Sequence, residues 1–267
     1  MRPLSARYGA KNGAGARDMA YTTPILRWPC KLPETAVVCQ NQINSGVYIS
    51  AKLTSAQSSI RSFFLEGPAG RLEALLNAGS REAAYAGLVC HPHPLGGGTM
   101  HNKVVFHATK ALNSFGFPVL RFNFRGTGLS AGKHEEGRGE LDDVKAALAW
   151  LQREFGLPIF FAGFSFGSAV GLRAACPDPG VKALISIGTP VTAEGRLYSF
   201  KFLRDCAKPK LFVSGDHDQY GPHAALEDVV AQAAEPKELV FLPGDHFFEG
   251  HLHELRMTIE SWIEEQL

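Results

Sequence analysis

The pentapeptide Gly163-Phe164-Ser165-Phe166-Gly167 is the feature of this 267-residue chain that most constrains its fold. An apolar run, residues 158–162, precedes it, and residues 168–175 after it have the composition of a helix. Gly-x-Ser-x-Gly between a strand and a helix is typical of a nucleophile elbow, a turn that strains the serine backbone and needs small neighbours. The motif therefore predicts that Ser165 stands free at the carboxyl edge of a sheet, before helix N–H groups that favour an oxyanion.

Strands and helices are predicted to alternate from residue 85 to the end of the chain. Uninterrupted apolar runs are typical of strands buried on both faces, and an apolar stripe with a 3.6-residue period indicates a helix. By these patterns we expect strands at 85–90, 117–124, 158–162, 181–187, 210–214 and 238–242, and helices at 102–115, 140–155, 168–175, 222–233 and 251–266. Such alternation predicts an α/β fold in which a mostly parallel central sheet carries helices on both faces.

A hairpin is predicted ahead of this alternating region. The turn cluster Gly67-Pro68-Ala69-Gly70 separates two short runs, residues 60–66 and 71–77. Glycine and proline in such a cluster are typical of the turn that joins two antiparallel strands. We therefore expect the folded part of the chain to begin near residue 60.

The first 59 residues differ from the rest in charge and in pattern. They contain seven Lys/Arg and two Asp/Glu, a net charge of +5. Residues 60–267 contain 20 Lys/Arg and 24 Asp/Glu, a net charge of −4. Apart from a short run at 47–53 that favours a strand, this stretch has no lasting periodicity. We expect residues 1–59 to be a disordered extension and residues 60–267 to form the folded domain. A transit-like segment and a stretch translated from too early a start codon are the alternatives.

Composition argues against several classes of protein. The net charge is +1, so the overall charge does not favour nucleic acid or an acidic membrane surface. No apolar run approaches the roughly 20 residues of a membrane span. The cysteines are odd in number and lack a C-x-x-C spacing, which argues against a disulfide framework or a zinc site and favours reduced thiols in the cytoplasm. They are Cys30, Cys39, Cys90, Cys176 and Cys206.

A serine hydroxyl needs a base, and the base needs an acid that orients it; after a nucleophile elbow the acid precedes the histidine in the sequence. The expected strand 210–214 ends in Gly215-Asp216-His217-Asp218, beyond a strand carboxyl end, where ligands bind in open α/β sheets. Asp216 and Asp218 are both candidates for the acid. We favour Asp218, because two further residues of turn carry it clear of the strand, and we expect Asp216 to support the turn.

His246 is the candidate base, because it lies in a glycine-bearing loop, residues 243–248, directly after the expected strand 238–242. Three other histidines also follow the serine. His217 adjoins the candidate acid, and His251 and His253 lie at the start of the last expected helix. The predicted catalytic triad is Ser165, Asp218 and His246.

Two backbone N–H groups are needed to stabilise an oxyanion at the serine. One is expected from Phe166, the residue after the serine, and the other from the loop at residues 91–100. The prolines of this loop have no N–H. We therefore expect Leu95 to be the second donor, with His93 and Gly96 as alternatives.

No metal or cofactor site is predicted. His91, His93 and His101 lie close together in the sequence, but no nearby carboxylate or cysteine completes a metal site, and loop shaping is the expected role. Gly126-x-Gly128 lacks the third glycine and the downstream acid of a dinucleotide-binding fingerprint. We interpret it as a tight turn at a strand end.

Four segments of this sequence together resemble those of a family of small bacterial α/β-hydrolases, related to dienelactone hydrolases and serine aminopeptidase-like hydrolases. The resemblance covers about residues 60–267 and implies an α/β-hydrolase fold with Ser165, Asp218 and His246 as the triad. Larger relatives insert a helical lid where this chain has residues 190–207, so the resemblance implies a minimal cap and a fairly open site. The four segments are His91-Pro92-His93-Pro94-Leu95-Gly96-Gly97, Arg121-Phe122-Asn123-Phe124-Arg125-Gly126, Gly163-Phe164-Ser165-Phe166-Gly167 and His246-Phe247-Phe248.

The resemblance and the candidate triad together predict a serine hydrolase of the carboxylesterase type, which cleaves small-molecule esters through an acyl-enzyme and needs no cofactor. A serine peptidase or an acyltransferase of the same fold is one alternative, since these differ in the leaving group or the acceptor and not in the triad. A catalytically silent hydrolase fold that serves as a binding module is the other. The intact set of Ser, Asp and His argues against this second alternative.

Overall fold

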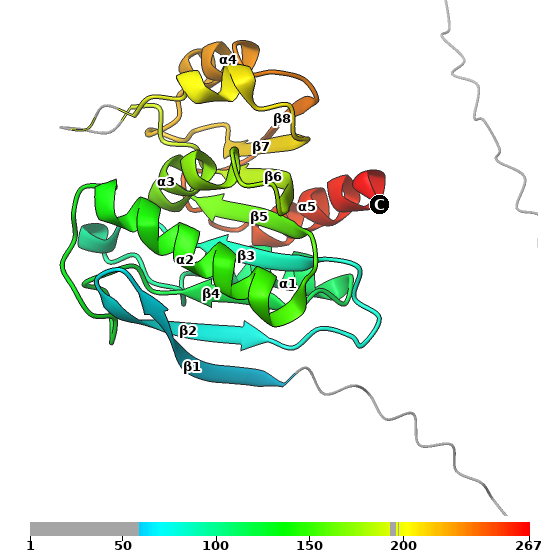
Figure 1. Cartoon of the computed structure of the whole chain (residues 1–267). Helices are drawn as coiled ribbons and strands as arrows, with labels where there is room; N and C mark the ends of the chain where they lie inside the picture. Colours follow the sequence, from blue (N-terminus) through cyan, green and yellow to red (C-terminus); the bar gives the residue numbers. More distant parts are fainter. Residues whose placement is uncertain (1–58, 193–195, 197) are drawn as a thin grey trace, which may run out of the picture. The chain divides into compact units, whose positions relative to one another are not determined.

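An eight-stranded β-sheet runs through the part of the chain that the computed structural model describes, residues 59–192, 196 and 198–267 (Figure 1). The strands lie in the order β1-β2-β4-β3-β5-β6-β7-β8. The β1–β2 and β2–β4 pairs are antiparallel and all the other pairs are parallel, which confirms the predicted hairpin and the mostly parallel sheet. The strands are β1 Ile60–Gly67, β2 Gly70–Asn77, β3 Ala86–Cys90, β4 Val119–Phe122, β5 Ile159–Phe164, β6 Val181–Ile187, β7 Lys210–Gly215 and β8 Lys237–Leu242.

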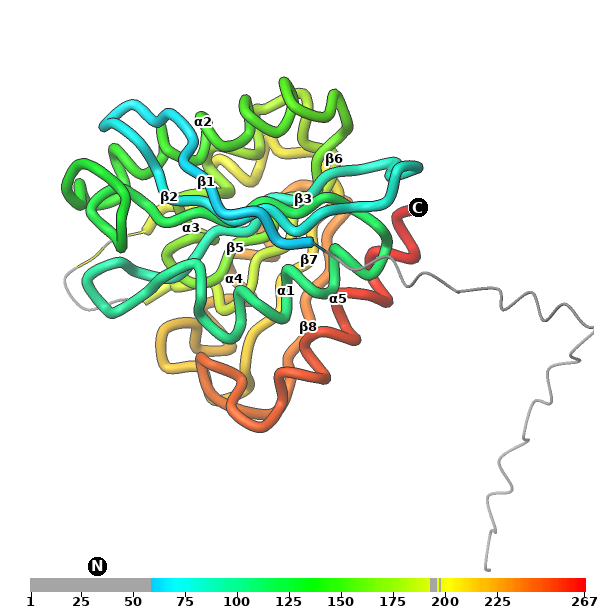
Figure 2. The backbone as a smooth tube through the Cα atoms, turned by 90° about the horizontal axis from the view of Figure 1, so that it is seen from below, coloured from blue at the N-terminus to red at the C-terminus, as the bar shows by residue number. Residues whose placement is uncertain are grey.

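Helices of the described residues cover both faces of this sheet, as predicted (Figure 1 and Figure 2). On one face α1 packs against α5, and on the other face α2 packs against α3. Apolar side chains of α4 join the core beneath α2 and α3. Within the described residues, no helix combines the length and the apolar character needed to cross a membrane. The helices are α1 Lys103–Ser114, α2 Arg138–Phe155, α3 Phe166–Ala175, α4 His223–Ala231 and α5 Leu252–Gln266, with two short 3-10 helices, η1 Pro94–Gly96 and η2 Lys201–Asp205.

Burial on both faces explains why the central strands are apolar along their whole length. All six residues of β5 are buried. Ile159 and Phe161 pack into the core beneath α2 and α3, whereas Phe160 and Ala162 pack into the core beneath α1 and α5. Because successive side chains of a strand point to opposite faces, a strand covered on both sides must be apolar at every position.

The helix α2 begins two residues before its predicted start, at Arg138 and not at residue 140. The reason is a polar contact, which an apolar stripe does not reveal. The buried Glu140 carboxylate accepts hydrogen bonds from the backbone N–H groups of Glu135 and Gly137, both at 2.8 Å. These contacts draw the preceding loop into the first helical turn. The strand expected at 47–53 lies outside the described residues.

A buried ion pair anchors the loop that joins β4 to α2. The Arg125 guanidinium lies 2.7 Å from Asp143 Oδ1 and 3.1 Å from Glu135 Oε1, and the Arg125 backbone N–H donates to Asp143 Oδ2 at 3.0 Å. Gly139 leaves room for the guanidinium, since a Cβ at that position would overlap it. The loop that leads into α2 is therefore held against the body of the domain.

Asp143→Ala is expected to lower the free energy of unfolding by about 3 kcal/mol, because it leaves a buried guanidinium without its main partner. Chemical denaturation measures this change. The matched control on the same helix is Asp142→Ala, whose carboxylate forms an exposed pair with Lys145 at 2.9 Å. Exposed pairs contribute less than about 1 kcal/mol, so equal losses in the two variants would contradict this assignment.

Candidate active site

Ser165 lies at the turn between β5 and α3, as the pentapeptide predicts. Its backbone has a φ of 54° and a ψ of −121°, a region that residues with a side chain rarely adopt. The Ser165 N–H donates a hydrogen bond to the Ile187 carbonyl at the end of β6, at 2.9 Å. Strain of this kind persists only where the surrounding structure holds it in place.

Gly163 and Gly167 make this turn possible. A Cβ at Gly163 would lie 2.5 Å from the carbonyl oxygen of Gly167, and a Cβ at Gly167 would lie 2.5 Å from the carbonyl oxygen of His91. Heavy atoms of different residues do not approach this closely without a bond, so no other residue type fits at either position. The close approach also brings the first turn of α3 against the loop that follows β3.

Asp218 and His246 form a buried pair at the carboxyl ends of β7 and β8. The Asp218 Oδ2 atom lies 2.8 Å from His246 Nδ1. Only 3% of Asp218 and 2% of His246 are exposed. The carboxylate also accepts hydrogen bonds from the Ser214 hydroxyl at 3.1 Å and from the backbone N–H groups of Tyr220 and Gly221 at 2.8 and 3.2 Å. These bonds hold the carboxylate in a fixed orientation toward the imidazole.

Aromatic rings fix the orientation of the His246 imidazole. The ring centroids of Phe164, Tyr220 and Phe247 lie 5.0, 4.7 and 5.2 Å from the centroid of the imidazole. A Cβ at Gly188 would lie 3.1 Å from His246 Cε1, so a glycine is needed beside the ring. The imidazole is thus oriented by packing on its faces and by Asp218 at Nδ1, and its Nε2 remains for a reacting proton.

The other candidate acid and bases lie apart from this pair. The Asp216 side chain is 37% exposed and bonds the Gly244 N–H at 2.9 Å and the neighbouring His217 ring at 2.5 Å, so it ties together the turns after β7 and β8. The His251 ring contacts Glu254 at 3.1 Å on α5. His253 is exposed on the same helix.

Ser165 and His246 open into the same cavity, which has a volume of about 230 Å³. Within residues 59–192, 196 and 198–267, no hydrogen bond joins the Ser165 hydroxyl to the imidazole. Such contacts are often long in enzymes without substrate and tighten when substrate binds. The cavity is lined by Pro92, His93, Leu95, Gly96, Gly97, Gly98, Asn102, Ser165, Pro190, Arg196, Tyr198, Tyr220, His246 and Phe247.

The backbone N–H groups near Ser165 differ in how far they are already engaged. Phe166 is the first residue of α3, and among the described residues its N–H has no acceptor. The Leu95 N–H donates to His93 Nδ1 at 3.1 Å, and the Leu95 residue is 71% exposed. The backbone N–H of His93 has no acceptor within the described part of the chain.

His91 attaches the loop after β3 to the end of β4. Its Nδ1 donates to the Pro92 carbonyl at 2.6 Å, and its Nε2 accepts from the Phe124 N–H at 3.0 Å. This second bond draws Phe124 out of the strand ladder, so β4 ends at Phe122 and not at the predicted residue 124. Gly98 closes the loop, because a Cβ there would overlap the Pro92 carbonyl. This glycine therefore permits contact between two parts of the backbone.

Residues 87–264 match a family model described as an alpha/beta hydrolase domain. The chain belongs to the α/β-hydrolase family. An uncharacterized protein of Rickettsia prowazekii is 34% identical over 208 residues, which are 75% of this chain and 87% of that protein. A solved α/β serine hydrolase homologue from Coxiella burnetii is 41% identical with a TM-score of 0.70, over 75% of this chain and 96% of that chain. A lidless α/β serine hydrolase from Xanthomonas campestris is 35% identical with a TM-score of 0.70, over 79% of this chain and 96% of that chain. The predicted family and fold are confirmed.

One group of side chains in the described part of this α/β-hydrolase has the spacing of a metal site. Ligand atoms of His93, His134 and Glu136 lie within 4.8 Å of one another. Burial lowers the pKa of His93 to about 4, so the ring is neutral near pH 7. Since His93 Nδ1 accepts the Leu95 N–H, the proton of the neutral ring is on Nε2, and that atom offers no lone pair to a metal. We therefore assign this group to packing beside the loop that follows β3.

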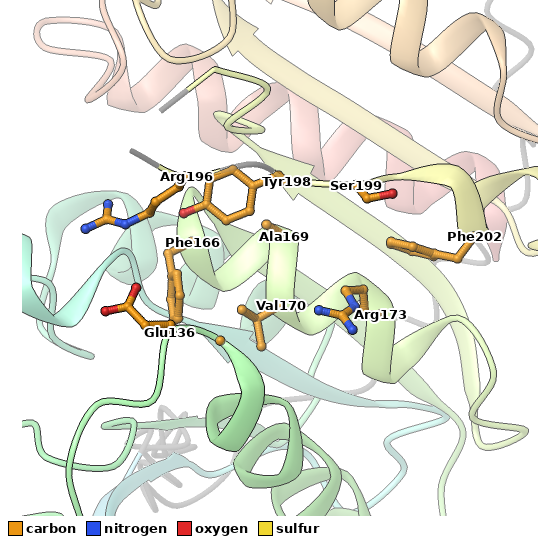
Figure 3. A pocket seen from close by; sticks show the side chains of 10 residues that line it. Glu136, Phe166, Ala169, Val170, Arg173, Arg196, Tyr198, Ser199 and Phe202 are labelled. Atoms are coloured by element: carbon orange, nitrogen blue, oxygen red, sulfur yellow. The ribbon is translucent and has the colours of Figure 1, made fainter. Parts of the chain in front are cut away.

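A second and larger cavity, of about 730 Å³, lies beside the first along α3 (Figure 3). It shares Arg196 and Tyr198 with the cavity of Ser165. The sequence carries one signal of this cavity, because positions 166, 169, 170 and 173 follow the i, i+3, i+4, i+7 spacing of one helix face. The lining residues are Glu136, Gly137, Phe166, Ala169, Val170, Arg173, Arg196, Tyr198, Ser199 and Phe202.

The phenylalanines of the two motif loops divide between core and cavity. Phe164 and Phe248 are fully buried in the core beneath α1 and α5. Phe166 is 2% exposed and packs in the core beneath α2 and α3, with an edge on the larger cavity, and Phe247, which is 49% exposed, lines the cavity of Ser165.

The neutral state of His91 predicts a loss of stability in acid. Burial lowers the pKa of His91 to about 3 from the usual 6.5, so between these values the unfolded chain binds a proton that the folded chain does not. The free energy of unfolding is therefore expected to fall from about pH 7 to about pH 5, by at most about 1.4 kcal/mol per pH unit from this one group.

Urea denaturation across this range measures the effect. His91→Gln keeps an acceptor for the Phe124 N–H but has no ionisable group, so its stability is expected to depend less on pH. The contribution of the neighbouring His93 is common to both proteins and cancels in the comparison. Parallel pH dependences of the two proteins would show that His91 is not the group responsible.

Proposed function

We propose that this α/β-hydrolase is a serine hydrolase of the carboxylesterase type, which cleaves esters through an acyl-enzyme. The observation that carries the proposal is the oriented Asp218–His246 pair, at 2.8 Å, which opens into one cavity with the strained Ser165. A structural ion pair would not require a serine held in unfavourable backbone geometry beside it. Backbone strain of this kind concentrates at sites where it positions a reacting group.

Ser165 is the nucleophile in this proposal. His246 Nε2 takes the hydroxyl proton as Ser165 Oγ bonds to the carbonyl carbon of the ester, and the carbonyl electron pair moves onto oxygen. When the tetrahedral intermediate collapses, the bond to the leaving alcohol breaks, and His246 donates its proton to that alcohol. Water then attacks the acyl-enzyme by the same route and releases the carboxylic acid. Every step uses groups of this chain and water.

Asp218 orients the base and stabilises its charged form. Its Oδ2 atom receives the His246 Nδ1–H, so the lone pair of the neutral ring is on Nε2, toward the serine. When the ring becomes an imidazolium, the carboxylate balances its charge inside the protein. The three other hydrogen bonds that Asp218 accepts hold the carboxylate in place beside the histidine.

The first oxyanion donor in the proposed mechanism is the Phe166 N–H, at the start of α3, where the helix dipole also favours negative charge. For the second donor, the hydrogen bond from the Leu95 N–H to His93 favours one of the two alternatives, the His93 N–H, over Leu95. Leu95 can serve only after that bond opens. The N–H of Gly96, the other alternative, already donates to the His93 carbonyl at 3.0 Å. The packing of Gly167 against the His91 carbonyl supports either choice, since it keeps the loop close to the elbow.

The access to Ser165 supports esters as substrates. Between β6 and β7, the described residues form only the short helix η2, Lys201–Asp205. The cavity of about 230 Å³ that contains Ser165 fits a small ester group and the water of the second half of the reaction.

Ser165→Ala is expected to abolish covalent labelling by a fluorophosphonate, because the label reacts only with an activated serine hydroxyl. Mass spectrometry of the labelled protein identifies the modified residue. Ser114→Ala, an exposed serine at the end of α1, is the control and is expected to keep the label. Labelling at another serine, or none in a folded wild-type protein, would favour the catalytically silent alternative.

Asp218→Asn and Asp216→Asn distinguish the acid from its neighbour. Loss of the orienting carboxylate costs about 10⁴ in turnover in the serine protease for which it has been established. We expect a loss approaching that size for Asp218→Asn on a short-chain ester, and a loss of less than about tenfold for Asp216→Asn, which leaves the His246 pair intact. Thermal melts of both variants test whether the fold is retained. An inactive Asp216→Asn beside an active Asp218→Asn would reverse the assignment.

A further inference from the structure

The larger cavity lies next to the cavity that contains Ser165. Phe166 carries the first oxyanion donor on its backbone, and its side chain lines the larger cavity. Arg196 and Tyr198 line both cavities. A molecule whose ester lies at Ser165 can therefore extend along α3 into the larger cavity. The volume of about 730 Å³ is within the range of sites for small-molecule ligands.

One face of α3 forms the floor of this cavity (Figure 3). The stripe begins with three apolar residues, Phe166, Ala169 and Val170, and ends with Arg173. The side chains of Tyr198 and Phe202 add aromatic surface from the segment between β6 and β7. The helix rises by about 6 Å over the apolar residues, from Phe166 to Val170, and by about 10 Å from Phe166 to Arg173.

The positive charges of the cavity are not balanced by their neighbours. Within residues 59–192, 196 and 198–267, neither Arg173 nor Arg196 forms an ion pair with an acidic side chain. Glu136 is the one acidic residue that lines the cavity, and its carboxylate lies 3.7 Å from the His134 ring. The described lining thus carries two guanidinium groups and one carboxylate, a net charge of +1.

We propose that the larger cavity binds an apolar portion of the ester substrate that ends in a carboxylate, with Arg173 as the partner of that carboxylate. This inference rests on the proposed function and names the substrate class. The apolar stripe contacts the body of the substrate, and the guanidinium at its end donates two parallel hydrogen bonds to the oxygens of a carboxylate in a planar, bidentate contact. Arg196, at the junction of the two cavities, adds attraction for the anion as it enters.

The test compares two esters of equal length. The acyl part of 4-nitrophenyl hydrogen suberate ends in a carboxylate, and that of 4-nitrophenyl octanoate ends in a methyl group. Arg173→Gln is expected to lower the ratio of kcat/KM for the suberate ester to kcat/KM for the octanoate ester by about fivefold. Arg173→Lys, which keeps the charge, should lower this ratio less than Arg173→Gln does. Arg153→Gln, an exposed change on α2, is the control and should leave the ratio as in the wild type.

Salt and inhibition give two further readouts. Because an exposed ion pair is screened, the wild-type ratio is expected to fall as the salt concentration rises, and the ratio of Arg173→Gln to change little. Suberate dianion should inhibit octanoate ester hydrolysis competitively, and less strongly in Arg173→Gln. Because suberate has no alcohol part, its inhibition reports on the carboxylate site whether the anion of the natural substrate lies on the acyl part or on the alcohol part. An unchanged ratio together with unchanged suberate inhibition in Arg173→Gln would overturn the proposal.

Failure of the proposed function has a different signature. In that case neither ester is hydrolysed and the fluorophosphonate does not label Ser165. Calorimetric titration of the wild type and of Arg173→Gln with suberate then still tests the cavity. Weaker binding to the variant supports the carboxylate site, and equal binding or none to either protein rejects it.

Discussion

The arrangement of the site depends on one steric constraint, the close approach of three backbone segments at the elbow. The carbonyl oxygens of Gly167 and His91 lie where Cβ atoms of Gly163 and Gly167 would stand. This packing forces Ser165 to a φ of 54° and sets the first N–H groups of α3 beside the loop after β3. Neither the serine nor the loop would keep its position alone, because the strain in the turn is offset by the packing of the strands and helix around it.

The two buried histidines of the motifs differ in their hydrogen-bond partners. His91 has only neutral partners, the Pro92 carbonyl and the Phe124 N–H, and both bonds require an uncharged ring. His246 is equally buried but lies against the Asp218 carboxylate, which can balance a positive charge when it forms. One histidine is therefore suited to hold a loop in place, and the other is suited to accept and release a proton during the proposed reaction.

In the proposed function, specificity depends on the surface beside the proposed triad. Strand ends of this kind serve many unrelated activities, so the proposed nucleophile, base and acid do not by themselves select a substrate. The face of α3 that begins at Phe166 runs along the larger cavity for two turns and ends at Arg173. In the segment between β6 and β7, Arg196 and Tyr198 line both cavities. The proposed recognition and the proposed catalysis thus use the same short helix.

The sequence by itself determined the order of strands and helices, the elbow and the family, because each depends on neighbouring residues: apolar runs, helical stripes and glycines beside one serine. It placed Asp218 and His246 beyond the carboxyl ends of two strands for the same reason. The Leu95 N–H bond to His93 and the early start of α2 are also local, but they depend on polar side chains that an apolar pattern does not reveal. Only the tertiary structure decided which acid meets the histidine, since those residues are 28 positions apart and the contact depends on the side chains of two separate loops. The charged cavity also arises from contacts between segments. Local patterns do not encode such contacts, because they form only when the sheet brings distant residues together.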